Sequence, residues 1–168
     1  MAKDYFIADT HFGHDAIIRY ENRPFKDTKN QEEYLVKNWN DVVKPEDTVY
    51  VLGDFGMSDS KEETERLCRM LNGNKILVMG NHDTQEPEWY RQCGFKEASP
   101  WPIIYQNFWI LSHEPLYINE NMPYANVYGH VHANPTYKDA SRQSVCVCVE
   151  RTEYKPISFE ELRKKVLG

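Results

Sequence analysis

The residues best able to do chemistry in this 168-residue chain stand directly after four short apolar runs. The runs end at Ala8, Gly53, Gly80 and Gly129, and carboxylate, amide or imidazole side chains follow each of them. An apolar run of this length, bounded by a glycine, is typical of a buried strand. Because open α/β sheets bind ligands just beyond the carboxyl ends of their strands, we expect these polar side chains to meet at one edge.

The six histidines support the same interpretation. Each of the six lies near an expected strand end: His11, His14, His82, His113, His130 and His132. One histidine in such a position is more often structural than ligating. Scattered histidines would fall partly on helices, and none of these does. Together with Asp9, Asp54 and Asn81 they indicate a metal site.

This donor set has a definite chemistry. Imidazole and carboxylate ligands suit Mn, Fe, Co, Ni and Zn, and one carboxylate can bridge two such ions. Asp9 and His11 would point the same way on a continuing strand, because residues two apart share a face, and the same holds for His130 and His132. Two ions about 3.5–4 Å apart ionise a bridging water near neutral pH and promote in-line attack on phosphorus. The residues therefore predict phosphoryl hydrolysis.

Composition sets limits on the partners. The length predicts a single domain over residues 1–168. A formal charge of −6 makes long nucleic acid an improbable partner, because Lys and Arg carry most phosphate-backbone binding. Bound cations would supply the positive charge that a small phosphate ester needs, a nucleotide included. Composition makes no prediction of oligomeric state.

The compartment is predicted from what the sequence lacks. The N-terminus carries no basic leader and no long apolar segment, so no membrane partner is expected. The four cysteines include no CxxC pair, and Cys146 and Cys148 alternate with valines as on one face of a strand. We expect reduced packing cysteines and a cytoplasmic location.

The elements that would position these residues alternate between strand and helix up to about residue 93 and are mostly strands beyond it. Strands are expected at about 3–8, 47–53, 76–79, 126–129 and 144–150, with a hairpin over 101–112. Helices are expected at 15–20, 31–43, 61–71, 86–93 and 159–166, with Asp15, Asn30 and Ser60 as N-caps of the first three. This order predicts an α/β chain whose sheets pack together under outer helices.

Five motifs in this order resemble the calcineurin-like metallophosphoesterase family. They are Asp9-Thr10-His11, Gly53-Asp54, Gly80-Asn81-His82-Asp83, His113 and Gly129-His130-Val131-His132. Any one of them alone is weak evidence, whereas all five together span most of the chain. Its small size is similar to that of compact prokaryotic and phage members. The resemblance implies a four-layer αββα sandwich of two mixed β-sheets flanked by helices.

The resemblance also implies roles for the motif residues. Seven of them would hold two divalent ions: Asp9, His11 and His132 one ion, Asn81, His113 and His130 the other, and Asp54 both. His82 would contact the scissile phosphate and protonate the leaving oxygen. Manganese is the expected metal, with Fe, Zn, Ni or Co as alternatives.

The chain departs from the family's protein phosphatases. Those members carry an aspartate three residues after the bridging aspartate and an arginine just beyond, where this chain has Met57 and Ser58. A protein phosphatase is therefore disfavoured. The residue that would orient His82 stays open between Asp59 and Asp15.

Phosphate contacts could come instead from His14 or Arg23, although His14 is equally well interpreted as a plain loop histidine. We expect a metal-dependent phosphodiesterase that uses a metal-bridging hydroxide and His82 as general acid, because no clamping arginine follows Asp54. A phosphomonoesterase acting on a small metabolite or nucleotide is the near alternative.

Two other functions are weaker. A nuclease could stack bases on aromatic residues, but such side chains are more often part of a core: Trp89, Tyr90, Tyr117, Tyr124 and Tyr128. A non-catalytic scaffold of the same fold is disfavoured because every ligand position keeps the expected residue type.

Overall fold

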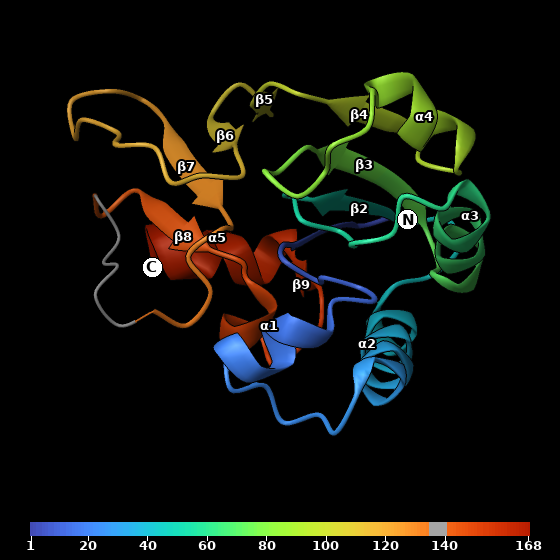
Figure 1. Ribbon diagram of the computed structural model, residues 1–168. Coiled ribbons are helices and arrows are strands. Elements are labelled where there is room, and N and C mark those ends of the chain that lie inside the picture. The colour runs from blue at the N-terminus through green and yellow to red at the C-terminus, as the bar shows by residue number, and fades with distance from the viewer. Residues whose placement is uncertain (135–140) are drawn as a thin grey trace.

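The computed structural model describes residues 1–134 and 141–168, which form two β-sheets (Figure 1). The first sheet contains β1 (Asp4–Ile7), β2 (Thr48–Val51), β3 (Asn74–Val78), β4 (Glu97–Ser99) and β9 (Ile157–Ser158), in the order β4-β3-β2-β1-β9. The second contains β5 (Ile103–Tyr105), β6 (Trp109–Leu111), β7 (Ala125–Tyr128) and β8 (Ser144–Cys146), in that order. In each sheet one edge strand, β9 or β5, is antiparallel to its neighbour and the other pairings are parallel.

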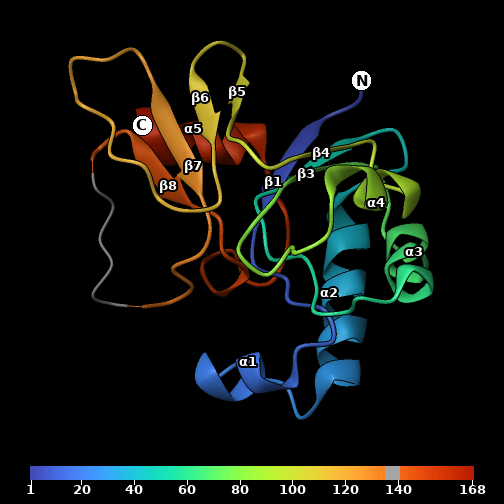
Figure 2. The ribbon, with the colours of Figure 1, turned by 45° about the horizontal axis from the view of Figure 1, so that its top comes forward.

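Helices flank these sheets. They are α1 (Asp15–Tyr20), α2 (Thr28–Val42), α3 (Lys61–Met70), α4 (Pro87–Gln92) and α5 (Phe159–Leu167), with a short 3₁₀ turn, η1 (Val149–Arg151). Figure 2 shows α2 and α3 on the side of the first sheet that faces away from the second. The predicted class, an α/β chain with two mixed sheets flanked by helices, is confirmed.

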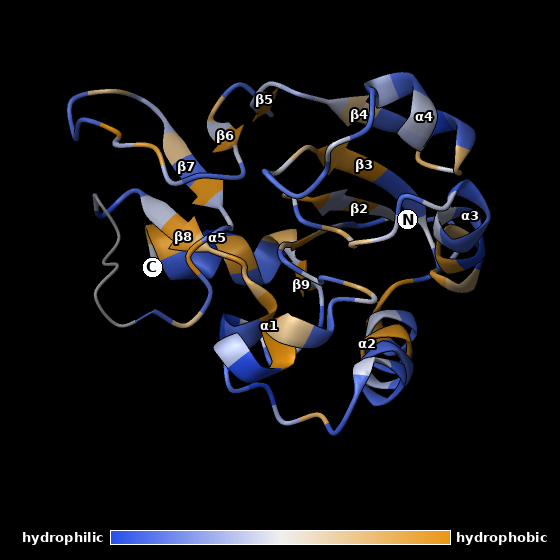
Figure 3. Cartoon of the chain, in the orientation of Figure 1, coloured by the Kyte–Doolittle hydropathy of each residue, from blue (hydrophilic) through white to orange (hydrophobic). Residues whose placement is uncertain are grey.

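Alternation along β1 divides the core into two layers. Tyr5 and Ile7 pack with the buried residues of α2 and α3, whereas Phe6 and Ala8 pack with side chains of the second sheet. Successive side chains of a strand point to opposite faces, so β1 is buried on both. The helices are hydrophobic on one part of their surface and hydrophilic on the rest (Figure 3). The first sheet is thus held between the helices and the second sheet.

The N-caps agree with the sequence prediction in one case of three. Ser60 caps α3 and accepts from the backbone N–H of Glu63, as predicted. Helix α2 begins at Thr28 because Asp27, and not Asn30, is its cap, and Asp27 accepts from the N–H of Asn30. Asp15 is wrong as a cap: it is the first helical residue of α1 and pairs with Arg19.

The strand predictions fail where the elements are short. The strand expected over 144–150 ends at Cys146 and turns into η1, and the sequence analysis missed β4 and β9, which have three and two residues. Such runs are too brief for an alternating pattern to appear. The predicted hairpin is confirmed, with positive φ at both Gln106 and Asn107 in its turn.

No helix among the described residues combines the length and apolar character needed to span a membrane.

Candidate metal centre

The motif loops leave neighbouring parallel strands at the same end. Strands β1, β2 and β3 are adjacent and parallel, and β6 and β7 are likewise parallel. The loops join where the two sheets meet, since the N–H of Ala8, after β1, donates to the carbonyl of Val147, after β8, and the N–H of Val149 donates to the carbonyl of Ala8. The predicted convergence at one edge therefore follows from the parallel pairing.

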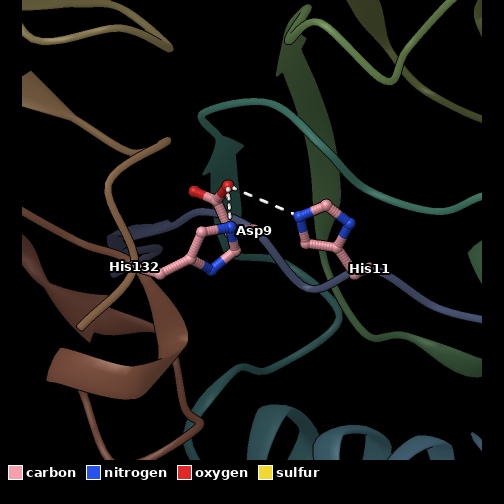
Figure 4. A group of neighbouring side chains, drawn as sticks. All are labelled: Asp9, His11 and His132. Carbon is pink, nitrogen blue, oxygen red and sulfur yellow. Dashed lines mark ion pairs between the residues drawn. The ribbon is translucent and has the colours of Figure 1, made fainter. Parts of the chain in front are cut away.

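The first donor group consists of Asp9, His11 and His132 (Figure 4). Asp9 Oδ1 lies 3.6 Å from His11 Nε2 and 3.6 Å from His132 Nε2. Asp9 and His11 are only 0% and 1% exposed. Asp9 Oδ1 and His11 Nε2 nevertheless have no hydrogen-bond partner among the described residues. Burying such atoms unpaired is costly, which points to a ligand that they share.

The second donor group consists of Asn81, His113 and His130. Asn81 Oδ1 lies 2.9 Å from His113 Nε2 and 3.1 Å from His130 Nδ1. The two histidine nitrogens are themselves 3.1 Å apart. Three donor atoms are thus gathered at one point of the loop edge.

Asp54 lies between the two groups. Its Oδ2 is 3.5 Å from His11 Nε2 and 3.5 Å from His113 Nε2, so a single carboxylate oxygen faces both. Metal–ligand bonds of about 2.0–2.2 Å put neighbouring ligand atoms roughly 3–3.6 Å apart. The separations here fit that spacing, and the donor types fit divalent transition metals.

The backbone at these residues is unusual. Five of the donors have a positive φ of 49–69°: Asp9, His11, Asp54, His130 and His132. Side-chain-bearing residues rarely adopt this left-handed conformation, and where they do the strain often marks a functional site. These tight left-handed turns bring donor residues from the loops of one sheet close to donor residues from the loops of the other.

This backbone changes two sequence predictions. Asp9 and His11 do converge, but through turns and not because they share the face of a continuing strand. The same argument is wrong for His130 and His132, which diverge: His132 joins the first donor group and His130 the second. The strand rule fails because β7 already ends at Tyr128.

Glycine is required where the carboxylates approach the backbone. A Cβ at Gly129 would lie 2.5 Å from Asp9 Oδ2, and one at Gly80 would collide with Asp54 Oδ1. The glycines of these motifs therefore make room for the aspartates.

The far ring nitrogens of three donor histidines have their own partners. His113 Nδ1 lies 2.8 Å from the Leu52 carbonyl, His132 Nδ1 2.9 Å from Glu150 Oε1 and His11 Nδ1 3.1 Å from His14 Nδ1. Such contacts fix the ring and leave the other nitrogen for the donor group. Sequence reasoning missed Glu150, because nothing in its surroundings resembles a motif.

Burial and charge act differently on these histidines. Burial lowers the pKa of His11. Burial also opposes protonation of His132, but the hydrogen bond to Glu150 and the charge of Asp9 outweigh it and raise its pKa. Burial, with the nearby His11 and His82, lowers the pKa of His14 to about 4, so that its ring is neutral at physiological pH.

His82 lies beside the first donor group. Its backbone N–H donates to Asp54 Oδ1 at 2.9 Å, and its ring centroid is 5.3 Å from that of His11 and 5.7 Å from that of His14. Neither open choice of orienting residue is supported, since Asp15 pairs with Arg19 and Asp59 accepts from Gln85. His14 is a ring neighbour of His82 instead.

Asp83 ties the two loops together. Its buried carboxylate accepts from the backbone N–H groups of Gly80, Asp54 and Phe55. Burial and the charge of Asp54 outweigh these hydrogen bonds and raise its pKa to about 6. The sequence analysis quoted Asp83 within its motif but assigned it no role.

Arg23 lies inside the protein, and its position does not support a contact with the substrate. Its side chain is fully buried, and its Nε, Nη1 and Nη2 atoms all donate within the protein. A guanidinium has five N–H donors, and the five bonds here leave none for a phosphate. His14, by contrast, is only partly buried beside His82.

Cys148 also touches the first donor group. Its thiol donates to Asp9 Oδ2, at 3.3 Å, and the N–H of His130 donates to the same oxygen at 2.7 Å. Cys146 Sγ lies 3.3 Å from Cys148 Sγ, and both cysteines are free and buried. Asp9 is thus held through Oδ2 while Oδ1 faces the histidines.

Comparison with known proteins identifies the class and the family. Two mixed sheets flanked by helices, with imidazole and carboxylate groups at their common edge, are consistent with the metallo-dependent phosphatase fold. The family model described as calcineurin-like phosphoesterase matches residues 5–150. The chain belongs to this family.

Individual relatives cover different shares of the chain. An uncharacterized protein of Methanocaldococcus jannaschii is 34% identical over 174 residues, which cover 99% of this chain and 92% of that protein. The Gene 66 protein of Mycobacterium phage L5 is 33% identical over 89 residues, or 52% of this chain and 42% of that protein.

Two solved structures are similar in fold. A protein of unknown function from Aquifex aeolicus has a TM-score of 0.78 and 32% identity, with coverage of 98% of this chain and 99% of that one. The Pseudomonas putida nuclease MPE has a TM-score of 0.53 at 18% identity, with coverage of 77% and 61%. At that identity the likeness to the nuclease concerns the fold alone.

Proposed function

We propose that this metal-dependent phosphoesterase hydrolyses the phosphodiester bonds of small substrates, including nucleotides. It would use two divalent ions, preferably manganese. The observation that carries the proposal is Asp54, which faces both donor groups through Oδ2 and accepts from the N–H of His82 through Oδ1. One residue thus links both expected metal sites to the expected acid.

The protein's residues would divide the work as follows. Asp9, His11 and His132 would hold one ion, Asn81, His113 and His130 the other, and Asp54 both. Bound there, the two ions would supply a water that ionises near neutral pH and would neutralise phosphate oxygens.

His82 would donate a proton to the leaving oxygen. Its ring lies beside His11 and His14, and the residue is half-buried, so part of it is accessible from outside. His14 would contact the phosphate with Nε2, since its Nδ1 faces His11. Both roles can be tested by substitution.

The preference for diesters rests on the loop after Asp54. Met57 is 42% exposed and Ser58 accepts from Ser60, and neither carries a positive charge for a dianionic monoester. A phosphomonoesterase remains the second candidate because of Arg151. Its Nε donates to the carbonyl of His132 at 2.7 Å, which places a half-buried guanidinium beside the first donor group.

Two further points bear on the substrate and the compartment. Tyr90 and Tyr128 are buried in the core, which removes two of the aromatic residues considered for base stacking and favours small substrates. The free cysteines are compatible with the reducing cytoplasm, which stays a prediction.

The test is an assay of the metal-reconstituted protein on bis(4-nitrophenyl) phosphate, 4-nitrophenyl phosphate and a panel of cyclic and linear nucleotides. We expect faster turnover of the diester, with the Asp54→Ala variant as the inactive control. Faster turnover of the monoester would replace the diesterase by the second candidate. No hydrolysis by a protein that holds two ions would favour a scaffold.

A further inference from the structure

A buried network of polar side chains lies behind the first donor group. We call its three members, Arg23, Gln31 and Glu150, the brace. Arg23 and Gln31 are 4% and 0% exposed, and the Glu150 side chain is 4% exposed. Arg23 donates to Glu150 Oε1 from Nε at 2.9 Å and from Nη2 at 2.7 Å. The desolvation cost of such a buried ion pair is offset by good geometry and further hydrogen bonds, and here all five N–H donors of Arg23 are bonded.

The brace holds the backbone of the Asp9–His11 turn. Arg23 donates to the carbonyl of Asp9 at 2.7 Å and to that of Thr10 at 3.1 Å, and Gln31 donates to that of His11 at 3.1 Å. Arg23 also donates to Gln31 Oε1 at 3.0 Å. Three successive carbonyls are thus fixed where φ is positive at the first and third residues. A strained turn persists only when its surroundings over-determine it.

The brace also orients the third member of the donor group. Glu150 Oε1 lies 2.9 Å from His132 Nδ1, which leaves Nε2 facing Asp9. A carboxylate behind a ligating imidazole fixes the ring and increases its basicity. A single support therefore serves all three members of the first donor group, Asp9, His11 and His132, which come from distant parts of the chain.

The second donor group has no comparable support in the described part of the chain. The far nitrogen of His113 meets the carbonyl of Leu52, a neutral acceptor. Asn81 is exposed and His130 is half-buried. The two groups therefore differ in the charge and in the number of side-chain contacts behind their donors.

A competing interpretation is a third ion. Glu21, His132 and Glu150 lie close enough to hold one, and Glu150 Oε2 is buried without a partner among the described residues. The Arg23 guanidinium, however, already gives Glu150 a paired positive charge. We do not assign a third site, because a second cation would have to sit beside that guanidinium.

We propose that Glu150 and Arg23 are positioning residues that make the first donor group the higher-affinity metal site. Glu150 acts on the ion through His132, and Arg23 acts through Glu150 and the Asp9 and Thr10 carbonyls. The inference rests on the proposed function only in requiring that the protein bind two divalent ions.

The experiment measures ions bound per chain at stepwise free Mn²⁺, with the wild type and Glu150→Gln compared. Glutamine keeps an acceptor for His132 but removes the charge, so the tighter ion should weaken by about 10- to 100-fold while the other is unchanged. Arg23→Lys is the second variant. It keeps the positive charge but cannot span the two carbonyls and Glu150, so it should weaken the same ion.

A double-mutant cycle with His132→Ala separates positioning from general destabilisation. If Glu150 acts through His132, Glu150→Gln should cost no further affinity once His132 is removed. Asp47→Asn is the matched control, because Asp47 is a buried carboxylate at the opposite end of β2, where it accepts from the N–H groups of Lys3 and Lys44. It should lower the unfolding temperature of the metal-free protein and leave both ions unchanged.

The outcomes are distinguishable. Equal weakening of both ions, no weakening, or additive losses in the cycle would each overturn the positioning role while leaving the phosphoesterase intact. Should wild-type protein bind no ion at all, the proposed function and this inference fail together. Selective loss of the tighter ion supports the inference whether or not a substrate is known.

Discussion

The two donor groups have similar ligands but different surroundings. Asp9 and His11 are nearly inaccessible, and side chains stand behind each member of the first group. In the second group Asn81 is exposed, and His113 is supported by a backbone carbonyl. The first group also contains a carboxylate of its own, whereas the second depends on Asp54 for negative charge. The first group is thus more completely supported by side chains, whereas in the second group only His113 is buried.

Removing Asp54 should weaken ion binding at both groups despite their different surroundings, because one carboxylate oxygen faces both of them. Asp54→Ala should lower the occupancy of both ions and eliminate hydrolysis, as measured by metal analysis after gel filtration and by the diester assay. Full retention of both ions would contradict the bridging position.

His82→Ala should separate chemistry from metal binding. If His82 is the general acid, the rate should fall by a factor of about 10² to 10⁴ while both ions remain. The loss should shrink for esters of nitrophenol, whose leaving oxygen needs little protonation. Loss of the ions in this variant would instead make His82 part of the metal site.

Asn81→Ala tests the asymmetry directly. The variant loses a neutral, exposed donor of the second group, so one ion should weaken and the other should keep its wild-type affinity. Titration with Mn²⁺ and equilibrium dialysis would resolve the two. An equal effect on both ions would mean that the groups are not independent.

Asp83→Ala should destabilise the protein at the contact between the Asp54 loop and the Asn81 loop. The carboxylate accepts from three buried backbone N–H groups, and leaving a buried donor unpaired costs about 1–3 kcal/mol. We expect a loss of at least that order in the free energy of unfolding, measured with urea on the metal-free protein. Asp54→Ala, which removes charge without freeing these donors, is a useful comparison.

The smallest expected effect is a pH dependence of the stability, caused by His14 beside the first donor group. The folded protein lowers the pKa of His14 to about 4, so between that value and its ordinary 6.5 the unfolded chain binds more protons. The contribution of His14 to stability should therefore fall as the pH falls through this window. His14→Gln should flatten the slope in the metal-free protein. Asp83, with a pKa raised to about 6, acts in the opposite direction, so only the difference between variant and wild type is informative.

Much of the fold followed from local patterns. Apolar runs that end in glycine located β2, β3 and β7, and helical spacing with Ser60 as a cap located α3. The shortest strands, β4 and β9, were missed because two or three residues carry no periodicity. Their pairing is decided by neighbours distant in the chain.

The candidate site divides in the same way. The motif residues meet as the resemblance implied, yet sequence reasoning gave the wrong geometric cause at Asp9 and His11 and the wrong direction at His130 and His132. It also offered Arg23, beside His14, as a possible phosphate contact, whereas the structure pairs Arg23 with Glu150. Left-handed turns and ion pairs between residues 127 positions apart leave no local signal.

Residue types and their order along the chain were sufficient to predict an α/β phosphoesterase with donors for two ions, because ligand chemistry and strand periodicity are local properties. The support behind those donors was decided by tertiary packing alone. Arg23, Gln31 and Glu150 have meaning only once the two ends of the chain are brought together, since burial converts ordinary surface side chains into partners that must be paired.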